Sequence, residues 1–242
     1  MQKVVHRADT RGKADHGWLK SAHSFSFAGY YNPERMGFGA LRVLNDDHVA
    51  GGGGFPSHPH QNMEIVSIPL LGDLAHKDSM GHTKVIREGD VQIMSAGTGV
   101  VHSEFNHSEK DPVKFLQIWV IPERQNVSPR YGQRAFKASE RQNRWQTVVA
   151  PFADDAFTES ESGPLFAHQQ TYFSLTHLNE GKTLDYEVKG KRHGVYFFVL
   201  SGEVDVAQET LVTRDAIGIV EANAVTLSAK KDSEVLAIEV PF

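Results

Sequence analysis

Residues 54–64 read GFPSHPHQNME, and this segment decides which fold and site the chain can form. Alternate side chains of a β-strand lie on the same face, so His58 and His60 are expected to project together. Pro59 cannot donate a hydrogen bond to a neighbouring strand, which places the segment at the start or edge of a strand. Two imidazoles spaced in this way can converge on one cation, and Glu64 has the same parity.

A second segment, residues 97–104, reads GTGVVHSE. By the same alternation, His102 and Glu104 share a face. If the fold places the two strands side by side, three imidazoles and a carboxylate surround one point. Such a set suits a borderline divalent metal such as iron and leaves room for water or substrate. Parity alone leaves open whether Glu64 or Glu104 is the carboxylate ligand.

Short apolar or alternating runs recur along the whole chain, separated by Gly, Asn, Asp and Pro. This spacing is typical of an all-β sandwich or barrel. One short helix is indicated at 153–157, and 158–164 has the composition of a loop. The expected strands are 25–31, 39–44, 64–70, 91–94, 100–105, 115–121, 172–178, 195–200, 203–207, 216–220, 225–227 and 235–240.

Residues 122–144 are polar and lack apolar periodicity, so we interpret them as the connector between two β units of similar size. Each unit has a Gly-punctuated strand–turn–strand, at 71–74 and at 201–204, which indicates two copies of one barrel of which only one kept its chemistry. The predicted division is 1–130 for an N-terminal metal-binding domain, 131–144 for a linker and 145–242 for a C-terminal domain without metal.

The composition excludes several classes of site and partner. The 242 residues include 13 His and no Cys, so disulfides, thiol nucleophiles and Cys-ligated metals are excluded, and any metal must be held by nitrogen and oxygen. Ten of the His lie within residues 1–110. Lys plus Arg number 25 and Asp plus Glu number 30, and the net charge of −5 argues against direct binding of nucleic acid or an anionic membrane.

The sequence carries no recognisable targeting signal. Residues 1–17 have charges throughout and no apolar stretch of the kind that a signal peptide needs. The longest apolar run, 195–200, is far shorter than the ~20 residues that span a bilayer. We therefore expect a cytoplasmic protein.

The spacing of these residues resembles the cupin double motif, G-x5-H-x-H-x3-E followed by G-x5-P-x-G-x2-H-x3-N. The matching positions are Gly52, His58, His60, Glu64, Gly89, Gly97, His102 and Asn106. This sequence differs from the cupin double motif at three points. Seven residues separate Glu64 from Gly72, Ser95 stands where the second motif has proline, and four residues separate Gly97 from His102.

These departures resemble the pirin branch of the cupins in particular. Three further segments carry the same resemblance, which runs over about residues 3–136 and is looser beyond them. They are HGWLKSAHSFSFAGYYNP (16–33), LQIWV (116–120) and PRYGQRAF (129–136).

The resemblance implies a bicupin, in which two double-stranded β-helix or jelly-roll barrels face each other and only the N-terminal one binds metal. Carried over residue by residue, the family's metal ligands fall on His58, His60, His102 and Glu104, and Glu64 is left as a neighbour. The usual metal of the family is Fe(II). The same ligand set also accepts Mn, Co, Ni, Cu or Zn.

Bacterial proteins resembling this one are quercetin 2,3-dioxygenases, which open the central ring of flavonols with O2 and release carbon monoxide. The resemblance implies a pirin-type oxidoreductase with a small aromatic, flavonol-like substrate and O2. A divalent metal lowers the pKa of a bound hydroxyl, and Glu104 is the expected catalytic residue that accepts the proton. Phe55 and Phe105 are candidate pocket walls, although Phe105 has the opposite parity to Glu104 and is expected to pack outside.

Two other functions stay open at this point. Pirin-like proteins of animals are regulators that bind other proteins, so one alternative is a metal-binding redox sensor acting through a protein partner, with flavonol turnover incidental. The other is a cupin isomerase for a small polar substrate. An isomerase would consume no O2, and a sensor would need a metal-dependent change at a surface patch.

Eight further histidines are interpreted without a metal. His16 and His23 are assigned structural roles, and His76, His82 and His107 are expected in loops or on the surface. The three histidines in the second half lack the two-residue spacing of a ligand pair, so no second metal site is expected there.

Overall fold

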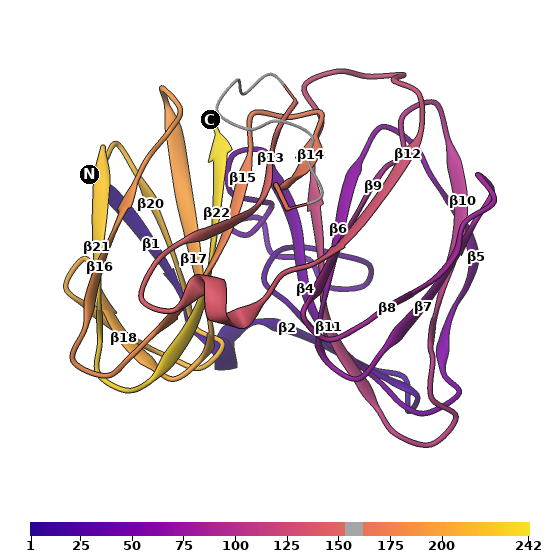
Figure 1. Ribbon diagram of the computed structural model, residues 1–242, viewed down its shortest axis with the longest axis horizontal. Coiled ribbons are helices and arrows are strands. Elements are labelled where there is room, and N and C mark those ends of the chain that lie inside the picture. The colour runs from indigo at the N-terminus through magenta and orange to yellow at the C-terminus, as the bar shows by residue number, and fades with distance from the viewer. Residues whose placement is uncertain (153–161) are drawn as a thin grey trace.

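The computed structural model describes residues 1–152 and 162–242 (Figure 1). In these ranges all elements are strands except two 3-10 helices, η1 (Ala8–Thr10) and η2 (Ala138–Arg141). The predicted all-β fold of two barrels is confirmed. The helix expected at 153–157 lies outside the described residues, as does most of the loop expected at 158–164.

The first barrel consists of a seven-stranded and a four-stranded sheet, which lie on the right in Figure 1. In hydrogen-bonded order, the larger sheet contains β12 (Arg130–Ala135), β9 (Asp90–Ser95), β6 (Glu64–Leu71), β11 (Val113–Val120), β4 (Leu41–Val49), β3 (Leu19–His23) and β2 (Gly12–Asp15). The smaller sheet contains β5 (Gly54–His60), β10 (Val100–Asn106), β7 (Leu74–Asp78) and β8 (Thr83–Ile86).

The second barrel likewise consists of a seven-stranded and a four-stranded sheet. Its larger sheet contains β1 (Gln2–His6), β20 (Ala216–Val220), β17 (His193–Ser201), β22 (Ser233–Pro241), β15 (Tyr172–Leu178), β13 (Gln146–Pro151) and β14 (Leu165–Ala167). Its smaller sheet contains β16 (Thr183–Glu187), β21 (Ala224–Ala229), β18 (Glu203–Val206) and β19 (Glu209–Val212).

The two barrels repeat one topology. Strands β4 to β11 correspond in order to strands β15 to β22, and within these two sets each strand has equivalent neighbours in its sheet. The turns that lead from β6 to β7 and from β17 to β18, each joining the larger sheet of its barrel to the smaller one, contain Gly72 and Gly202, whose φ angles of 72° and 92° lie in the left-handed region that glycine adopts without strain. The Gly-punctuated similarity of the two halves thus reflects equivalent turns.

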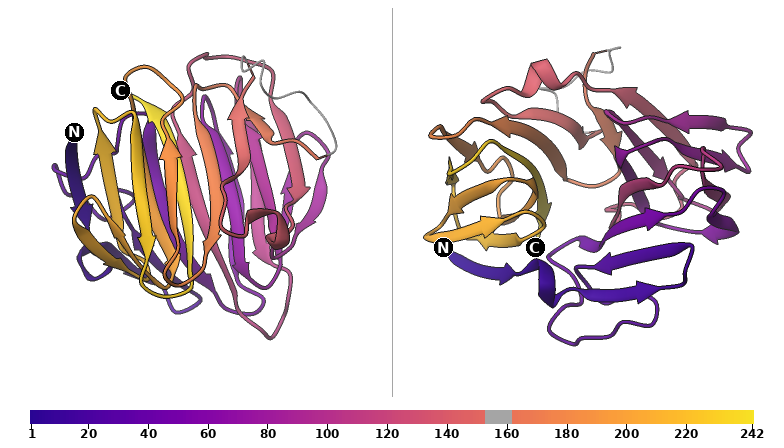
Figure 2. Two further views of the ribbon diagram at one scale, coloured as in Figure 1. Left: turned by 60° about the vertical axis from the view of Figure 1, so that its left-hand side comes forward. Right: turned by 90° about the horizontal axis from the view of Figure 1, so that it is seen from below.

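The main apolar core lies between the two larger sheets. Strands β6, β9 and β17 are buried along almost their whole length, because one face points into a barrel and the other faces the opposite barrel. The largest apolar cluster includes Leu44 and Ile118 from the first barrel and Phe173, Phe198 and Ile238 from the second. Each such side chain contributes roughly 1.5–3 kcal/mol on burial, and together they hold the barrels side by side, as the right-hand view of Figure 2 shows.

Residues 25–31, which were expected to form a strand, form a tight turn instead. Ala28 has a φ of 49°, and the backbones of Phe27 and Tyr30 exchange two hydrogen bonds across the turn. Phe25 is buried in the main core. The apolar run therefore anchors a loop and does not indicate a strand.

The polar connector expected at 122–144 contains strand β12, which pairs along its length with β9. Its side chains are mostly half-buried and do not alternate between a buried and an exposed face. The alternation of apolar and polar residues that predicts a strand is therefore missing. At the other end of the chain, β1 pairs with β20 of the second barrel. The division into 1–130, 131–144 and 145–242 stays a prediction, although the first strand of the chain belongs to the second barrel's sheet.

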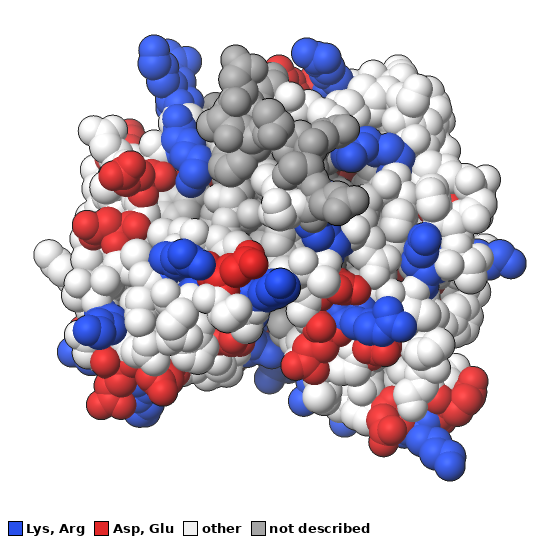
Figure 3. All heavy atoms as spheres, in the orientation of Figure 1, with Lys and Arg blue, Asp and Glu red and all other residues white. Residues whose placement is uncertain are grey.

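The face of the molecule in Figure 3 carries Lys and Arg interspersed with Asp and Glu. A surface of mixed sign has no broad field that would attract a polyanion to that face. Among the residues that the structure describes, no helix has the length and apolar character needed to cross a membrane.

Candidate metal centre

The site is built on β5 and β10, which lie side by side in the smaller sheet of the first barrel. Their antiparallel register places His58 opposite His102 and His60 opposite Val100. The ring centroids of the three histidines are 4.8, 4.5 and 4.8 Å apart. One ligand nitrogen of each lies within 4.8 Å of the others, so the structure brings these three imidazoles together.

The position of β5 explains how its histidines are oriented. β5 is an edge strand, as Pro59 indicates. His58 Nδ1 lies 2.8 Å from the backbone carbonyl oxygen of Pro56, and because a carbonyl only accepts, Nδ1 donates. This hydrogen bond leaves Nε2 of His58 with the lone pair that a metal requires.

His60 and His102 are held in the neutral form that coordinates a metal. Burial lowers the pKa of His60 to about 4 and the pKa of His102 to about 3, and the neighbouring imidazoles add to both effects. Neither ring nitrogen of buried His102 has a hydrogen-bond partner among the described residues. A buried polar atom without a partner is unfavourable, and a metal ion bound to one of these nitrogens would remove that penalty. The donor set therefore fits a divalent metal.

Glu104 approaches the site from the side of His102. Its carboxylate forms a second group with His102 and His76, whose ligand atoms lie within 4.8 Å of one another, and it does not belong to the group of three imidazoles. Oε1 accepts a hydrogen bond from Ser67 Oγ (3.1 Å), and Oε2 accepts one from Gln117 Nε2 (2.7 Å). Burial raises the pKa of Glu104 to about 7 despite the hydrogen bond from Ser67.

Glu64 belongs to neither group. Asn62, with a φ of 49°, lies between β5 and β6 and ends the alternation that gave Glu64 the parity of His58. The carboxylate of Glu64 accepts hydrogen bonds from Ser95 Oγ (2.8 Å) and from the backbone N–H of His168 (3.2 Å). Glu64 therefore links the first barrel to the second.

His76 is a site residue that the spacing rules did not identify. The expectation that it lies in a loop or on the surface is wrong, because it is on β7, only 1% exposed, with its ring 5.4 Å from that of His102. Its Nε2 donates to Asp78 Oδ2 (3.0 Å), and the H-x-D spacing of this pair was the signal available in the sequence. His82 is half-buried in the turn after β7, and His107 is exposed as expected.

Aromatic side chains flank the imidazoles on one side. The ring of Trp119 lies 4.9 Å from that of His60, and Phe27 lies 5.3 Å from Trp119. Phe55, an expected pocket wall, packs instead against a small apolar cluster of the first barrel. Phe105 is 40% exposed, in agreement with its parity.

These observations define a class of protein. Two jelly-roll barrels of one topology pack against each other, and both His and Glu groups of the described residues lie in the first barrel. This is the architecture of a bicupin with the donor set for a single metal ion.

Comparison with known proteins identifies the family. Residues 4–120 match the family model described as Pirin, and residues 158–240 match the model described as Quercetinase C-terminal cupin domain. Quercetin 2,3-dioxygenase of Escherichia coli (strain K12) is 40% identical over 237 residues, which are 98% of each chain. The Pirin-like protein of Caulobacter vibrioides is 37% identical over 231 residues, 96% of each chain. The chain belongs to the pirin family.

The same relationship is seen among solved structures. YhhW from Escherichia coli matches with a TM-score of 0.91 at 39% identity, over 99% of this chain and 98% of that chain. YhhW in complex with nickel(II) matches with a TM-score of 0.91 at 38% identity, over 99% of both chains. The resemblance to bacterial pirin-type quercetin 2,3-dioxygenases that the motifs indicated is confirmed.

Proposed function

We propose that this protein is a metal-dependent dioxygenase that opens the central ring of flavonols such as quercetin with O2 and releases carbon monoxide. The observation that carries the proposal is the convergence of His58, His60 and His102 beside the buried carboxyl group of Glu104. Relatives named quercetin 2,3-dioxygenase over nearly the whole chain support a flavonol substrate.

His58, His60 and His102 would hold the metal, with Glu104 as the proposed fourth ligand. When bound, a divalent metal supplies a Lewis acid that lowers the pKa of the flavonol 3-hydroxyl. We propose Fe(II) as the natural metal. Nitrogen and oxygen donors of this kind also take up Mn, Co, Ni, Cu or Zn, and a related structure contains nickel(II).

Glu104 is the proposed acceptor of the substrate proton. Burial raises the pKa of this carboxyl group to about 7 in the metal-free protein, and a bound divalent cation would favour its ionised form, which can accept a proton. Hydrogen bonds from Ser67 and Gln117 fix the orientation of both carboxyl oxygens. Glu104 is 2% exposed, so bulk water does not compete for the proton.

The aromatic side of the site is the proposed location of the substrate rings. Trp119 and Phe27 meet edge to face beside His60, and such rings offer a planar polyphenol offset or edge contacts.

The direct test is turnover by the reconstituted protein. Metal-free protein is loaded with Fe(II) under anaerobic conditions, quercetin and O2 are added, and carbon monoxide release and O2 consumption are measured. We expect carbon monoxide in proportion to the quercetin consumed, and none from His58→Ala or His102→Ala. If loaded protein consumes no O2, the dioxygenase proposal fails, and the redox-sensing alternative is then tested through metal-dependent binding of a protein partner.

A further inference from the structure

Three buried nitrogen atoms next to the candidate metal centre have no hydrogen-bond partner within the described part of the chain. They are Nδ1 and Nε2 of His102 and Nδ1 of His76. The two rings lie 5.4 Å apart, and their ligand nitrogens are within 4.8 Å of each other. Because an unpaired buried polar group is unfavourable, three of them together indicate a missing partner.

Asp78 determines which nitrogen of His76 carries the proton. Asp78 Oδ2 lies 3.0 Å from His76 Nε2, while Oδ1 accepts the backbone N–H groups of Met80 (2.9 Å) and His82 (3.0 Å). Burial opposes ionisation of Asp78, but the hydrogen bonds from His76 and His82 outweigh it and lower the pKa of Asp78. A carboxylate only accepts, so His76 donates from Nε2 and keeps a lone pair on Nδ1.

His102 lacks an acceptor for its remaining N–H. A neutral imidazole has one nitrogen with a lone pair and one with a proton. A metal shared with His58 and His60 would take the lone pair of His102, which leaves an N–H without an acceptor. The lone pair on His76 Nδ1 is the neighbouring acceptor that has no hydrogen bond among the described residues, whereas each oxygen of Glu104 already accepts one.

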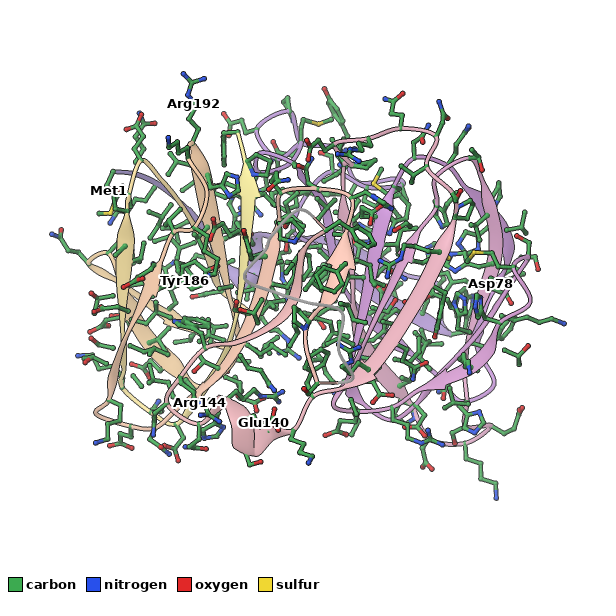
Figure 4. All side chains as sticks on the ribbon, turned by 45° about the horizontal axis from the view of Figure 1, so that its top comes forward. Met1, Asp78, Glu140, Arg144, Tyr186 and Arg192 are labelled. Atoms are coloured by element: carbon green, nitrogen blue, oxygen red, sulfur yellow. The ribbon has the colours of Figure 1, made fainter. Side chains whose placement is uncertain are left out.

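We propose that His76 and Asp78 are positioning residues of the metal centre. His76 Nδ1 accepts the N–H of His102, Asp78 fixes the tautomer of His76, and the chain directs the lone pair of His102 toward His58 and His60. Outer partners of this kind orient a metal ligand and raise its basicity. The inference rests on the proposed metal site and is independent of the flavonol reaction. Figure 4 shows Asp78 within the first barrel.

The rival interpretation is a second cation bound by His76, His102 and Glu104. That arrangement needs a lone pair on both nitrogens of His102, so the ring would have to lose its remaining proton. The hydrogen-bonded chain satisfies all three nitrogens with a neutral ring and one metal. The two interpretations differ in the number of metal ions per chain.

Asp78→Asn is the sharpest test. The asparagine carbonyl must accept the two backbone N–H groups, so its NH2 group faces His76 Nε2 and reverses the tautomer of His76. Two N–H groups then oppose each other between His76 and His102. We expect one Co(II) per chain, about 10–100-fold weaker binding in competition with a chromophoric chelator, and a changed visible spectrum of the Co(II) protein.

A pair of substitutions at His76 separates hydrogen bonding from packing. His76→Asn keeps an acceptor close to the position of Nδ1 and should bind Co(II) within about threefold of the original protein, whereas His76→Leu removes the acceptor and should lose about 10–100-fold. This pair also decides the matter if Asp78→Asn fails to fold. Unfolding of the metal-free variants by urea measures any purely structural effect.

The second barrel offers a matched control. His193 Nδ1 lies 2.8 Å from Glu239 Oε1, a buried histidine–carboxylate pair like that of the first barrel but away from the metal ligands. Glu239→Gln should leave Co(II) affinity and spectrum unchanged.

The proposal would be overturned if both Asp78→Asn and His76→Leu kept the Co(II) affinity and the visible spectrum of the original protein. Two Co(II) ions per chain, falling to one in His76→Leu, would overturn it in favour of the second cation. Metal binding without carbon monoxide release would remove only the proposed reaction.

Discussion

The two barrels have one topology but different interiors. Val206 follows Gly202 in the second barrel at the same distance as His76 follows Gly72 in the first. His76 pairs with Glu104 on the next strand, and Val206 pairs with Leu227. Extending this register gives the equivalent residues of the two interiors. The pairs are His58 and Tyr186, His76 and Val206, His102 and Val225, Glu104 and Leu227, Ser67 and Phe197, and Gln117 and Ala237.

The difference shows how one fold divides stability and chemistry between two copies. A single large apolar cluster fills the interior of the second barrel, whereas the described residues of the first barrel form two smaller clusters. Figure 4 shows Tyr186 and Asp78 in opposite halves of the molecule. Apolar burial stabilises the second barrel, and the first barrel replaces part of it with imidazoles, carboxyl groups and their hydrogen-bond partners.

The largest expected effect comes from removing a ligand. His102→Ala should lower metal affinity by more than about 100-fold, which is the upper end of the loss expected when only a hydrogen-bond partner of a ligand is removed. All turnover should be lost with the metal. Val225→Ala, at the equivalent position, should keep the metal and lower the free energy of unfolding by about 1–3 kcal/mol. Metal content by elemental analysis and urea unfolding check both. Equal metal loss in the two variants would contradict the assignment of the site to one barrel.

Glu104→Gln should lower kcat by about 10²–10⁴-fold, because the amide cannot accept the substrate proton. In the metal-loaded original protein, kcat should rise with pH as Glu104 ionises. The midpoint should lie below the metal-free pKa of about 7, because the bound cation favours the carboxylate, and this rise should be absent from the variant. Metal content is measured alongside to separate proton transfer from metal binding. Glu64→Gln, which alters another buried carboxyl group, should leave the pH profile intact, and a profile that also changes there would count against Glu104 as the base.

Exchanging the equivalent residues Glu104 and Leu227 tests whether the first barrel, and not the second, provides hydrogen-bond partners for a buried carboxyl group. Leu227→Glu should lower the free energy of unfolding by about 3 kcal/mol or more, because the equivalents of Ser67 and Gln117 are apolar and leave the carboxyl group unpaired. Glu104→Leu should be far less harmful to the metal-free protein. Urea unfolding of both metal-free variants measures the difference. Similar losses in the free energy of unfolding would show that the two interiors do not differ in hydrogen bonding to a buried carboxyl group.

The last prediction concerns the pH dependence of stability. Burial raises the pKa of Asp47 from 3.8 to about 7, despite a hydrogen bond from Ser21. Because the folded pKa lies above the unfolded one, Asp47 contributes stability that is complete below about pH 4 and is lost as pH rises through about 7.

Asp47→Asn should therefore reduce the loss of stability of the metal-free protein between pH 4 and pH 7. Thr176 occupies the equivalent position of the second barrel, and Thr176→Ser should leave the slope unchanged. Urea unfolding across this range provides the measurement. An identical slope in Asp47→Asn and the original protein would show that Asp47 is ionised in the folded state.

Much of the site was predictable because its signals are local. His58 and His60 share a strand, so alternation alone places them on one face, and Pro59 marks that strand as an edge. The parity of Glu64 was misleading, because the positive φ of Asn62 ends the strand between them. Strand β12 was missed because its half-buried residues have no apolar alternation.

By itself, the sequence determined the all-β fold, the duplicated turns, the absence of thiolate ligands and the placement of His58 and His60 on one face, since each depends on composition or on the two-residue period of a strand. The tertiary structure alone decided that Glu104 faces His102 and His76, and that Glu64 links the barrels. It also decided that His76 and Asp78 are next to the site, because this depends on β7 being the neighbour of β10. Side chains from separate strands meet only when the sheet fixes their register, and no local pattern contains that information.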